Sequence, residues 1–195
     1  MSRRTLVDID DRILDAVMEI GAAEGVSAIS AQKVAKICGI SHFTCFDHFG
    51  TRQNMIDQAK IAFENKYTKI LMDNLNQYEN IEDLWVAMLD ELTKTPSGTV
   101  FYLNYNSLYG FKPTPQNMNF GMFKGTLIKV LGEIPGFTDE MYMLTWDYLF
   151  NQAFIYARYI IRGNVSNTPN HKNFIKDLVF RGVREITSGK CTYNL

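Results

Sequence analysis

The sequence predicts an all-α protein, in which a small N-terminal helix-turn-helix domain precedes a larger helical bundle, with about nine helices in all. Apolar residues recur at intervals of three and four along most of the 195 residues, which is the spacing of one helix face. No segment shows the sustained alternation of apolar and polar residues that is typical of a half-buried strand. Clusters of glycine, proline and asparagine separate the periodic segments and indicate where helices end.

The composition favours a folded protein with a substantial core. Hydrophobic residues make up 46% of the chain, and the net charge is −1, so any DNA binding must come from a local surface rather than from overall charge. No apolar run approaches the roughly 18–20 residues that span a bilayer, and the N-terminus does not resemble a signal peptide. We therefore expect a cytoplasmic protein that has no membrane partner and needs no cofactor.

Three cysteines, Cys38, Cys45 and Cys191, have no metal-ligand spacing. All three are expected to be unpaired thiols, and Cys38 and Cys45 are predicted to fill core space, with redox sensing as the alternative. The chain also lacks a serine elbow, a glycine-rich phosphate loop and paired histidine or cysteine ligands. These absences indicate that it is not an enzyme.

The first helix is predicted by four apolar residues at helical spacing, Ile9, Ile13, Val17 and Ile20. Gly25 is expected to end it, and Ser30 is a candidate N-cap for the second helix. The buried face of the second helix is predicted to hold Val34, Ala35, Ile37 and Cys38.

A tight turn follows the second helix. Gly39 can adopt the left-handed conformation that ends a helix, Ile40 can fill the space between two helices, and Ser41 can cap the next one. The third helix is then predicted over residues 42–49, and Gly50 closes it. A helix, a glycine turn, a buried aliphatic residue and a capped helix form the layout of a helix-turn-helix, whose second helix enters the DNA major groove.

The rest of the chain is predicted to be helical. Thr51 is a candidate N-cap for a long helix over 51–74, with an apolar stripe of Met55, Ile56, Ala59, Phe63, Tyr67, Ile70 and Leu71. Further helices are predicted over 81–94, 98–109, 115–133, 138–162 and 171–188. The aromatic run from Val100 to Tyr109 could also form a strand, but its length and neighbours favour helix.

The N-terminal part resembles the TetR family of transcriptional repressors. The resemblance rests on the text from Ile40 to Arg52, with its His48-Phe49-Gly50-Thr51-Arg52 junction, and on the upstream Ile13-Leu14-Asp15-Ala16, Glu24-Gly25 and Val34-Ala35-Lys36 with Gly39. It covers roughly residues 9–60. It implies a DNA-binding helix-turn-helix domain at 1–50 and a ligand-binding and dimerisation domain at 51–195, in which the helix at 51–74 links the two.

The same resemblance implies a ligand-responsive transcriptional regulator that acts as a repressor. Each subunit of a homodimer would place one reading helix in the major groove of a palindromic operator. A small molecule in the C-terminal bundle would release the DNA, and the helix at 51–74 would act as the lever.

The DNA contacts that the resemblance implies involve ten residues: Gln32, Lys33, Ser41, His42, Phe43, Thr44, Phe46, Asp47, His48 and Arg52. Phe46 stands where the family usually has a tyrosine, so the hydroxyl that contacts a phosphate is missing. Asp47 could accept from a cytosine amino group or could repel DNA. Phe43 could touch a thymine methyl group or pack on its own domain. His42 could read a base, or could be an exposed residue beside the helix cap. His48 could read a base, or could pack on its own domain or bind a phosphate.

The charge of this region leaves a second function open. Up to Lys66 the chain has eight Lys and Arg against nine Asp and Glu, whereas phosphate neutralisation is the main sequence-independent source of DNA affinity. The alternative is a helical ligand-binding or partner-binding dimer whose helix-turn-helix has lost its affinity for DNA.

The C-terminal bundle is rich in large apolar residues that could line a cavity for an apolar or aromatic effector. The candidates are Trp85, Met88, Phe101, Tyr102, Tyr105, Tyr109, Phe123, Trp146 and Phe150; plain core packing is the alternative for each. The segment from Met141 to Ile161 is apolar on nearly all faces and the last helix has an apolar stripe. These two helices are expected to form the homodimer seam, or else a single-subunit core.

Overall fold

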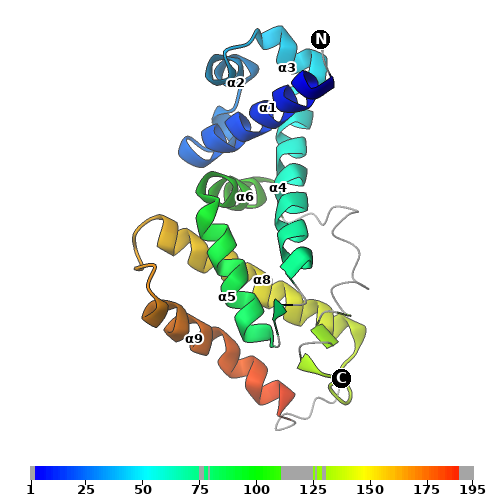
Figure 1. The fold of residues 1–195 in the computed structure, drawn as a ribbon, viewed down its shortest axis with the longest axis vertical. Coiled ribbons are helices and arrows are strands. Elements are labelled where there is room, and N and C mark those ends of the chain that lie inside the picture. Colours follow the sequence, from blue (N-terminus) through cyan, green and yellow to red (C-terminus); the bar gives the residue numbers. More distant parts are fainter. Residues whose placement is uncertain are drawn as a thin grey trace. The chain divides into compact units, whose positions relative to one another are not determined.

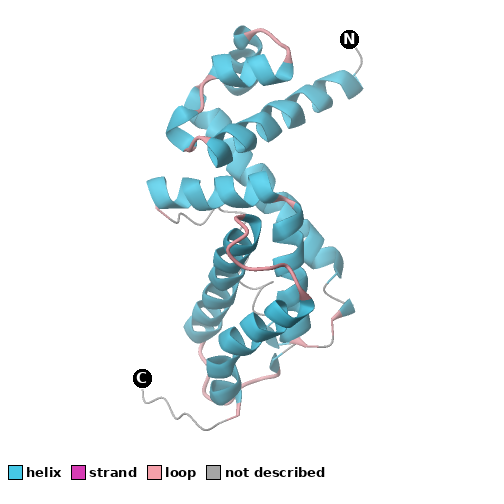
Figure 2. Cartoon of the chain, turned by 90° about the vertical axis from the view of Figure 1, so that its left-hand side faces the viewer, coloured by secondary structure: helices cyan, strands magenta, loops and turns pink. Residues whose placement is uncertain are grey.

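The computed structural model describes residues 3–74, 77–78, 80–110, 125, 127–128 and 131–188. Within these residues the protein is all helical, as predicted, and Figure 2 shows helices and loops without a strand. The elements are α1 (Arg3–Ala23), the 3-10 turn η1 (Val26–Ala28), α2 (Ala31–Cys38), α3 (His42–Phe49), α4 (Arg52–Asn74), α5 (Ile81–Lys94), α6 (Pro96–Tyr109), α8 (Asp139–Ile161) and α9 (Pro169–Thr187).

Eight of the nine expected helices are thus confirmed in the described part of the chain. The expected helix over 115–133 lies mostly outside it, and so do Phe123 and Cys191. The aromatic run from Val100 to Tyr109 is helical, which excludes the strand alternative. None of the described helices is both long and apolar enough to cross a membrane.

Packing divides the chain into two compact units. The first contains residues 1–69 and 95–112, and the second contains 70–94 and 113–195. These units are defined by which residues lie close together in space. The predicted boundary at residue 50 separates two functions instead, and it stays a prediction.

Both helices of the helix-turn-helix begin at their predicted N-caps. The Ser30 hydroxyl accepts a hydrogen bond from the Lys33 amide at 3.3 Å, and the Ser41 hydroxyl accepts one from the Phe43 amide at 3.2 Å. Gly39, between them, has φ 65° and ψ 35°, a left-handed conformation that costs a glycine little. These local bonds fix the ends of α2 and α3, which pack beside α1 in Figure 1.

The buried face of α2 differs from the prediction at one residue. Val34, Ala35 and Cys38 are buried, but Ile37 is 52% exposed. A helix turns about 100° per residue, which places Ile37 about 110° from the centre of the inward face formed by the other three. The prediction of a buried Ile37 is therefore wrong, and its side chain lies on the surface of the helix-turn-helix.

Helix α6 completes the core of the first unit. Phe101 is fully buried in the same cluster as the residues of α1, α2 and α3, and the Asn104 side chain donates to the Gly21 carbonyl at 2.9 Å. A β-carbon on Gly21 would lie 2.5 Å from the Phe101 ring, closer than atoms in contact can approach. Glycine at this position therefore lets α6 pack closely against α1.

The second unit is built from α5, α8 and α9. Trp85 is fully buried, packs edge-on against Phe180 with 6.0 Å between ring centroids, and donates its indole N–H to the Leu149 carbonyl at 2.8 Å. Its apolar body and its polar atom are therefore both accommodated by the protein itself.

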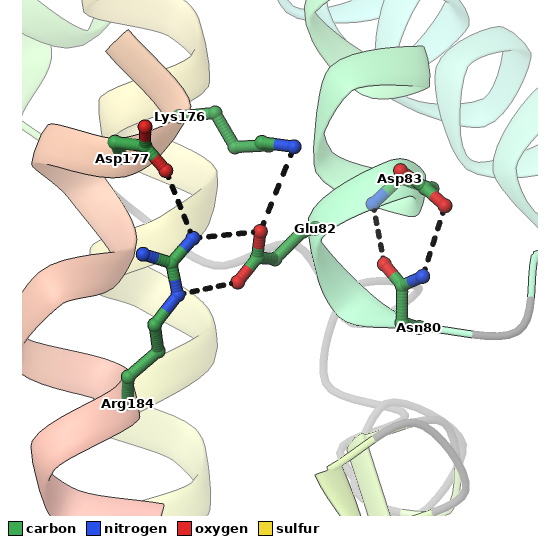
Figure 3. A network of polar contacts seen from close by, with 6 residues as sticks. All are labelled: Asn80, Glu82, Asp83, Lys176, Asp177 and Arg184. Carbon is green, nitrogen blue, oxygen red and sulfur yellow. Dashed lines mark hydrogen bonds and ion pairs between the residues drawn. The ribbon is translucent and has the colours of Figure 1, made fainter. Parts of the chain in front are cut away.

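A charged network joins α5 to α9 at the surface of the second unit (Figure 3). Arg184 donates to both oxygens of Glu82, at 2.7 and 2.8 Å, and to Asp177 at 3.0 Å. Lys176 lies 3.6 Å from Glu82. These partners lower the pKa of Glu82, chiefly through the hydrogen bonds from Arg184, so the carboxylate stays charged and holds α9 against α5.

Candidate DNA-binding surface and effector site

Helix α3 has two chemically different faces. Cys45 and Phe49 point inward and are buried, whereas Phe43 is 66% exposed and Phe46 is 42% exposed. Residues three apart lie on one side of a helix, and Asp47, which is also exposed, lies on that same side. The predicted reading helix therefore presents an aromatic and acidic face outward.

The start of α3 is accessible as well. Ser41 is exposed, and His42 and Thr44 are half-buried. The His42 ring lies against the Phe43 ring, with 4.2 Å between centroids. His42 therefore has a position from which it could reach DNA, and its ring also covers part of Phe43.

His48 faces its own domain. Its Nδ1 atom lies 2.5 Å from an oxygen of Asp10 on α1, and its side chain is 20% exposed. This contact ties α3 to α1. Of the two interpretations of His48, it supports the packing role.

Arg52, a candidate phosphate contact, is occupied by the backbone. Its Nε atom donates to the Ile29 carbonyl at 2.6 Å, and its Nη2 atom donates to Val26 at 2.9 Å and Ser27 at 3.2 Å. The guanidinium therefore holds the turn before α2 against the start of α4. The sequence contains no local signal for this role, because the partners lie 23 to 26 residues away. A phosphate contact by Arg52 stays a prediction.

The two candidates at the start of α2 differ in their surroundings. Gln32 is exposed, whereas the Lys33 ammonium lies 2.6 Å from the Glu24 carboxylate. Helix α3 itself contains neither lysine nor arginine. Helix α3 therefore brings no cationic side chain of its own, apart from its two histidines.

The two described cysteines are buried in the same core. Burial raises the pKa of the Cys38 thiol and of the Cys45 thiol, which lowers the fraction of reactive thiolate. The Cys38 thiol also contacts the Arg12 carbonyl at 3.3 Å. The geometry supports core filling over redox sensing. Among the described residues, no group of acidic, histidine and cysteine side chains could hold a metal ion.

Four of the effector candidates belong to the first unit. Phe101 and Tyr102 are buried, and Tyr105 donates its hydroxyl to Asp57 at 2.7 Å. Tyr109 donates to Gln53 at 3.2 Å. Burial raises the pKa of Tyr105, so its hydroxyl keeps its proton. In this structure these tyrosines fasten α6 to α4 through polar ends.

The other described candidates belong to the second unit. Trp85 and Met88 are buried, and Trp146 and Phe150 are half-buried and stack with 6.1 Å between ring centroids. Phe123 lies outside the described residues. The structure thus divides the effector candidates between two units, and their role as ligand contacts stays a prediction.

The first unit also contains a groove that the sequence did not suggest. It has a volume of about 580 Å³ and lies between α1, α4 and the start of α6. Its lining is formed by Asp11, Leu14, Asp15, Met18, Glu19, Ala62, Phe63, Lys66 and residues 95–98. None of the predicted effector contacts is among them.

Comparison with known proteins places this architecture. No protein-family model matches the sequence, and no curated protein is significantly similar to it. The structure, however, is similar to that of a TetR family transcription regulator from Marinobacter aquaeolei, with a TM-score of 0.75 over 92% of this chain and 97% of that one, at 15% identity. The chain has the TetR-family fold.

Two further solved structures agree. A TetR-family transcriptional regulator from Haemophilus influenzae gives a TM-score of 0.69 at 16% identity, covering 92% of this chain and 98% of that one. A putative TetR family regulator from Shewanella gives 0.67 at 19% identity, covering 90% and 97%. The TetR resemblance seen over residues 9–60 therefore extends, in fold, to nearly the whole chain.

Proposed function

We propose that this protein is a DNA-binding transcription regulator, and that helix α3 is its reading helix. The observation that carries the proposal is the capped α3, whose Phe43, Phe46 and Asp47 face outward while Cys45 and Phe49 anchor it from behind. Solved structures with this fold are described as transcription regulators, which supports the same assignment. As such a regulator, the protein would act in the cytoplasm.

We propose further that the protein works as a homodimer on palindromic DNA. Helices α8 and α9 expose a set of large apolar side chains, namely Met143, Leu144, Tyr148, Ile155, Tyr159, Phe174 and Leu178. By helical spacing, Leu144, Tyr148, Ile155 and Tyr159 share one side of α8, and Phe174 and Leu178 share one side of α9. Exposed apolar residues gathered in this way are typical of an interaction site. Pairing two such surfaces would give a four-helix seam, and a two-fold axis would match two half-sites about one duplex turn apart.

The regulator is proposed to be a repressor that a small apolar or aromatic molecule releases from DNA. Support comes from the aromatic residues of α5, α6 and α8, and from the tyrosine bonds between α6 and α4. Helix α6 also packs on α1 through Phe101. A ligand that favours one position of α6 would therefore shift the helix-turn-helix between conformations that bind DNA and conformations that do not.

The test is a titration of labelled DNA from the region flanking the protein's own gene with the protein, at several salt concentrations, with fluorescence anisotropy of the DNA as the readout. We expect anisotropy to rise with that DNA, and to rise less with unrelated DNA of equal length. Log affinity should fall linearly with log salt. A total lack of binding at low salt would contradict the proposal.

The same titration separates the second candidate function. A helical dimer that binds only a ligand or a protein partner would show no DNA complex at any salt concentration. The exposed Asp47 on α3, together with the lack of lysine and arginine in this helix, is what keeps that candidate open.

A further inference from the structure

The outward face of the helix-turn-helix is aromatic and acidic where a DNA-binding protein is expected to be cationic. Phe43 is 66% exposed, Ile37 is 52% exposed and Phe46 is 42% exposed. Phe43 and Phe46 are three residues apart on α3, and Ile37 comes from the adjoining helix of the same motif. Their exposure adds little to the stability of the fold, because core packing of α3 is already provided by Cys45 and Phe49.

The side chains on α3 restrict what it can read in DNA. Guanine is read chiefly by arginine or lysine and adenine by asparagine or glutamine, and none of these four residue types occurs between His42 and Phe49. A phenyl ring has no hydrogen-bond donor for a phosphate or a base edge. The one feature of the major groove that matches a phenyl ring is the methyl group of thymine.

We infer that Phe43 and Phe46 are specificity-determining residues of the helix-turn-helix and that they recognise thymine methyl groups in the major groove. This inference rests on the proposed function, since it assigns the sequence class that the reading helix selects. Binding removes the exposed rings from water and places the methyl groups against them, so recognition is driven by apolar burial and not by ion pairing.

The experiment begins by selecting bound sequences from a randomised duplex library with the full-length protein. Each thymine of the selected site is then replaced singly by uracil, which removes the methyl group and leaves every hydrogen bond in place. We expect affinity to fall about fourfold for each contacted methyl group, at one or more positions in each half-site. Substitutions outside the half-sites should have no effect.

Variants assign the methyl contacts to residues. In Phe43→Ala or Phe46→Ala, affinity for the thymine site should fall, and the penalty for uracil at one position should disappear. The salt dependence should stay unchanged, because no ionic contact is lost. Leu108→Ala is the matched control: this residue of α6 is 53% exposed and lies outside the helix-turn-helix, so both affinity and the uracil penalty should be retained.

The outcomes separate the inference from the function on which it rests. If no sequence is enriched and no DNA is bound at low salt, the proposed function fails. If DNA is bound but uracil changes affinity less than twofold at every position, the function stands and the thymine assignment is overturned. The assignment is also overturned if both alanine variants keep the full uracil penalty.

Discussion

At the scale of single residues, one of the two tightest glycine–aromatic contacts in the first unit is between Gly21 and Phe101. Gly21 has space for no β-carbon, since one would lie 2.5 Å from the ring of Phe101 and 3.2 Å from Ile29. Phe101 is itself fully buried in the core of the first unit. The position of α6 on α1 therefore depends on one missing methyl group.

Overpacking a core costs about 1–3 kcal/mol, whereas alanine in place of glycine gains roughly 1 kcal/mol in a helix interior. Replacing Gly21 by alanine is therefore expected to destabilise the protein by up to about 2 kcal/mol. Urea denaturation followed by circular dichroism measures the change. In Gly21→Ala combined with Phe101→Leu, the smaller side chain relieves the contact, so the combined loss should be smaller than the sum of the two single losses. Strict additivity would contradict the proposed contact.

Arg52 offers a second test at this scale, because its two suggested roles predict different results. As a clamp on the carbonyls of Val26, Ser27 and Ile29, it cannot be replaced by lysine, whose ammonium is not a planar fork. Arg52→Lys should therefore lower the free energy of unfolding by about 1–2 kcal/mol. Lys69→Arg, an exposed change on the same helix, should leave it nearly unchanged. Unchanged stability with weakened DNA binding in Arg52→Lys would instead indicate a phosphate contact.

The comparison of sequence with structure is clearest among these residues. Ser30, Gly39 and Ser41 were predictable because capping and left-handed turns are properties of a few neighbouring residues. The carbonyl clamp of Arg52 and the insertion of Phe101 into the core formed with α1, α2 and α3 join segments far apart in the chain. Periodicity predicts that Phe101 lies on the buried face of a helix, but it does not predict which part of the protein that face packs against.

At the scale of elements, α9 is held to α5 by a cluster of charges as well as by apolar packing. Glu82 of α5 accepts two hydrogen bonds from Arg184 of α9, and Val179 and Phe180 of α9 are buried. The pKa of Glu82 in the folded protein is lowered from its ordinary 4.5, so the ion pair favours folding only while the carboxylate is charged.

Glu82→Gln should therefore cost stability at neutral pH and little in acid. A group with a lowered folded pKa contributes its full stability above about pH 4.5, and this contribution is lost as the pH falls through the folded value. We expect a difference of at most about 1 kcal/mol from the wild type at pH 7, since Arg184 is partly exposed, and a shrinking difference below pH 4.5. Urea denaturation at pH 7 and pH 4 measures it.

The control for this pH effect is Glu185→Gln, which changes an exposed carboxylate next to Arg184 in sequence. Glu185→Gln should change the free energy of unfolding only slightly, without the difference between pH 7 and pH 4 expected for Glu82→Gln. A loss in Glu82→Gln that is equal at pH 7 and pH 4 would mean that the side chain contributes through packing and not through charge.

At the scale of the whole molecule, the proposed repressor depends on a seam between two subunits. Leu144 on α8 is 58% exposed and Leu178 on α9 is 54% exposed, and in the proposed dimer both would be covered. A carboxylate placed there would remain solvated in the single chain but would be buried without a partner in the dimer. The two states therefore respond differently to the same substitution.

Leu144→Asp or Leu178→Asp is accordingly expected to give a folded monomer whose helix content matches that of the wild type. Sedimentation velocity measures the oligomeric state, and circular dichroism measures the folding. Leu108→Asp, at a site of similar exposure on α6, should leave the dimer intact. In the proposed dimer, two reading helices bind two half-sites together. A monomer would lose the binding free energy of the second half-site, so its operator affinity should also fall. A wild-type protein that sediments as a monomer at micromolar concentration and yet binds its operator tightly would show that this apolar face serves another purpose.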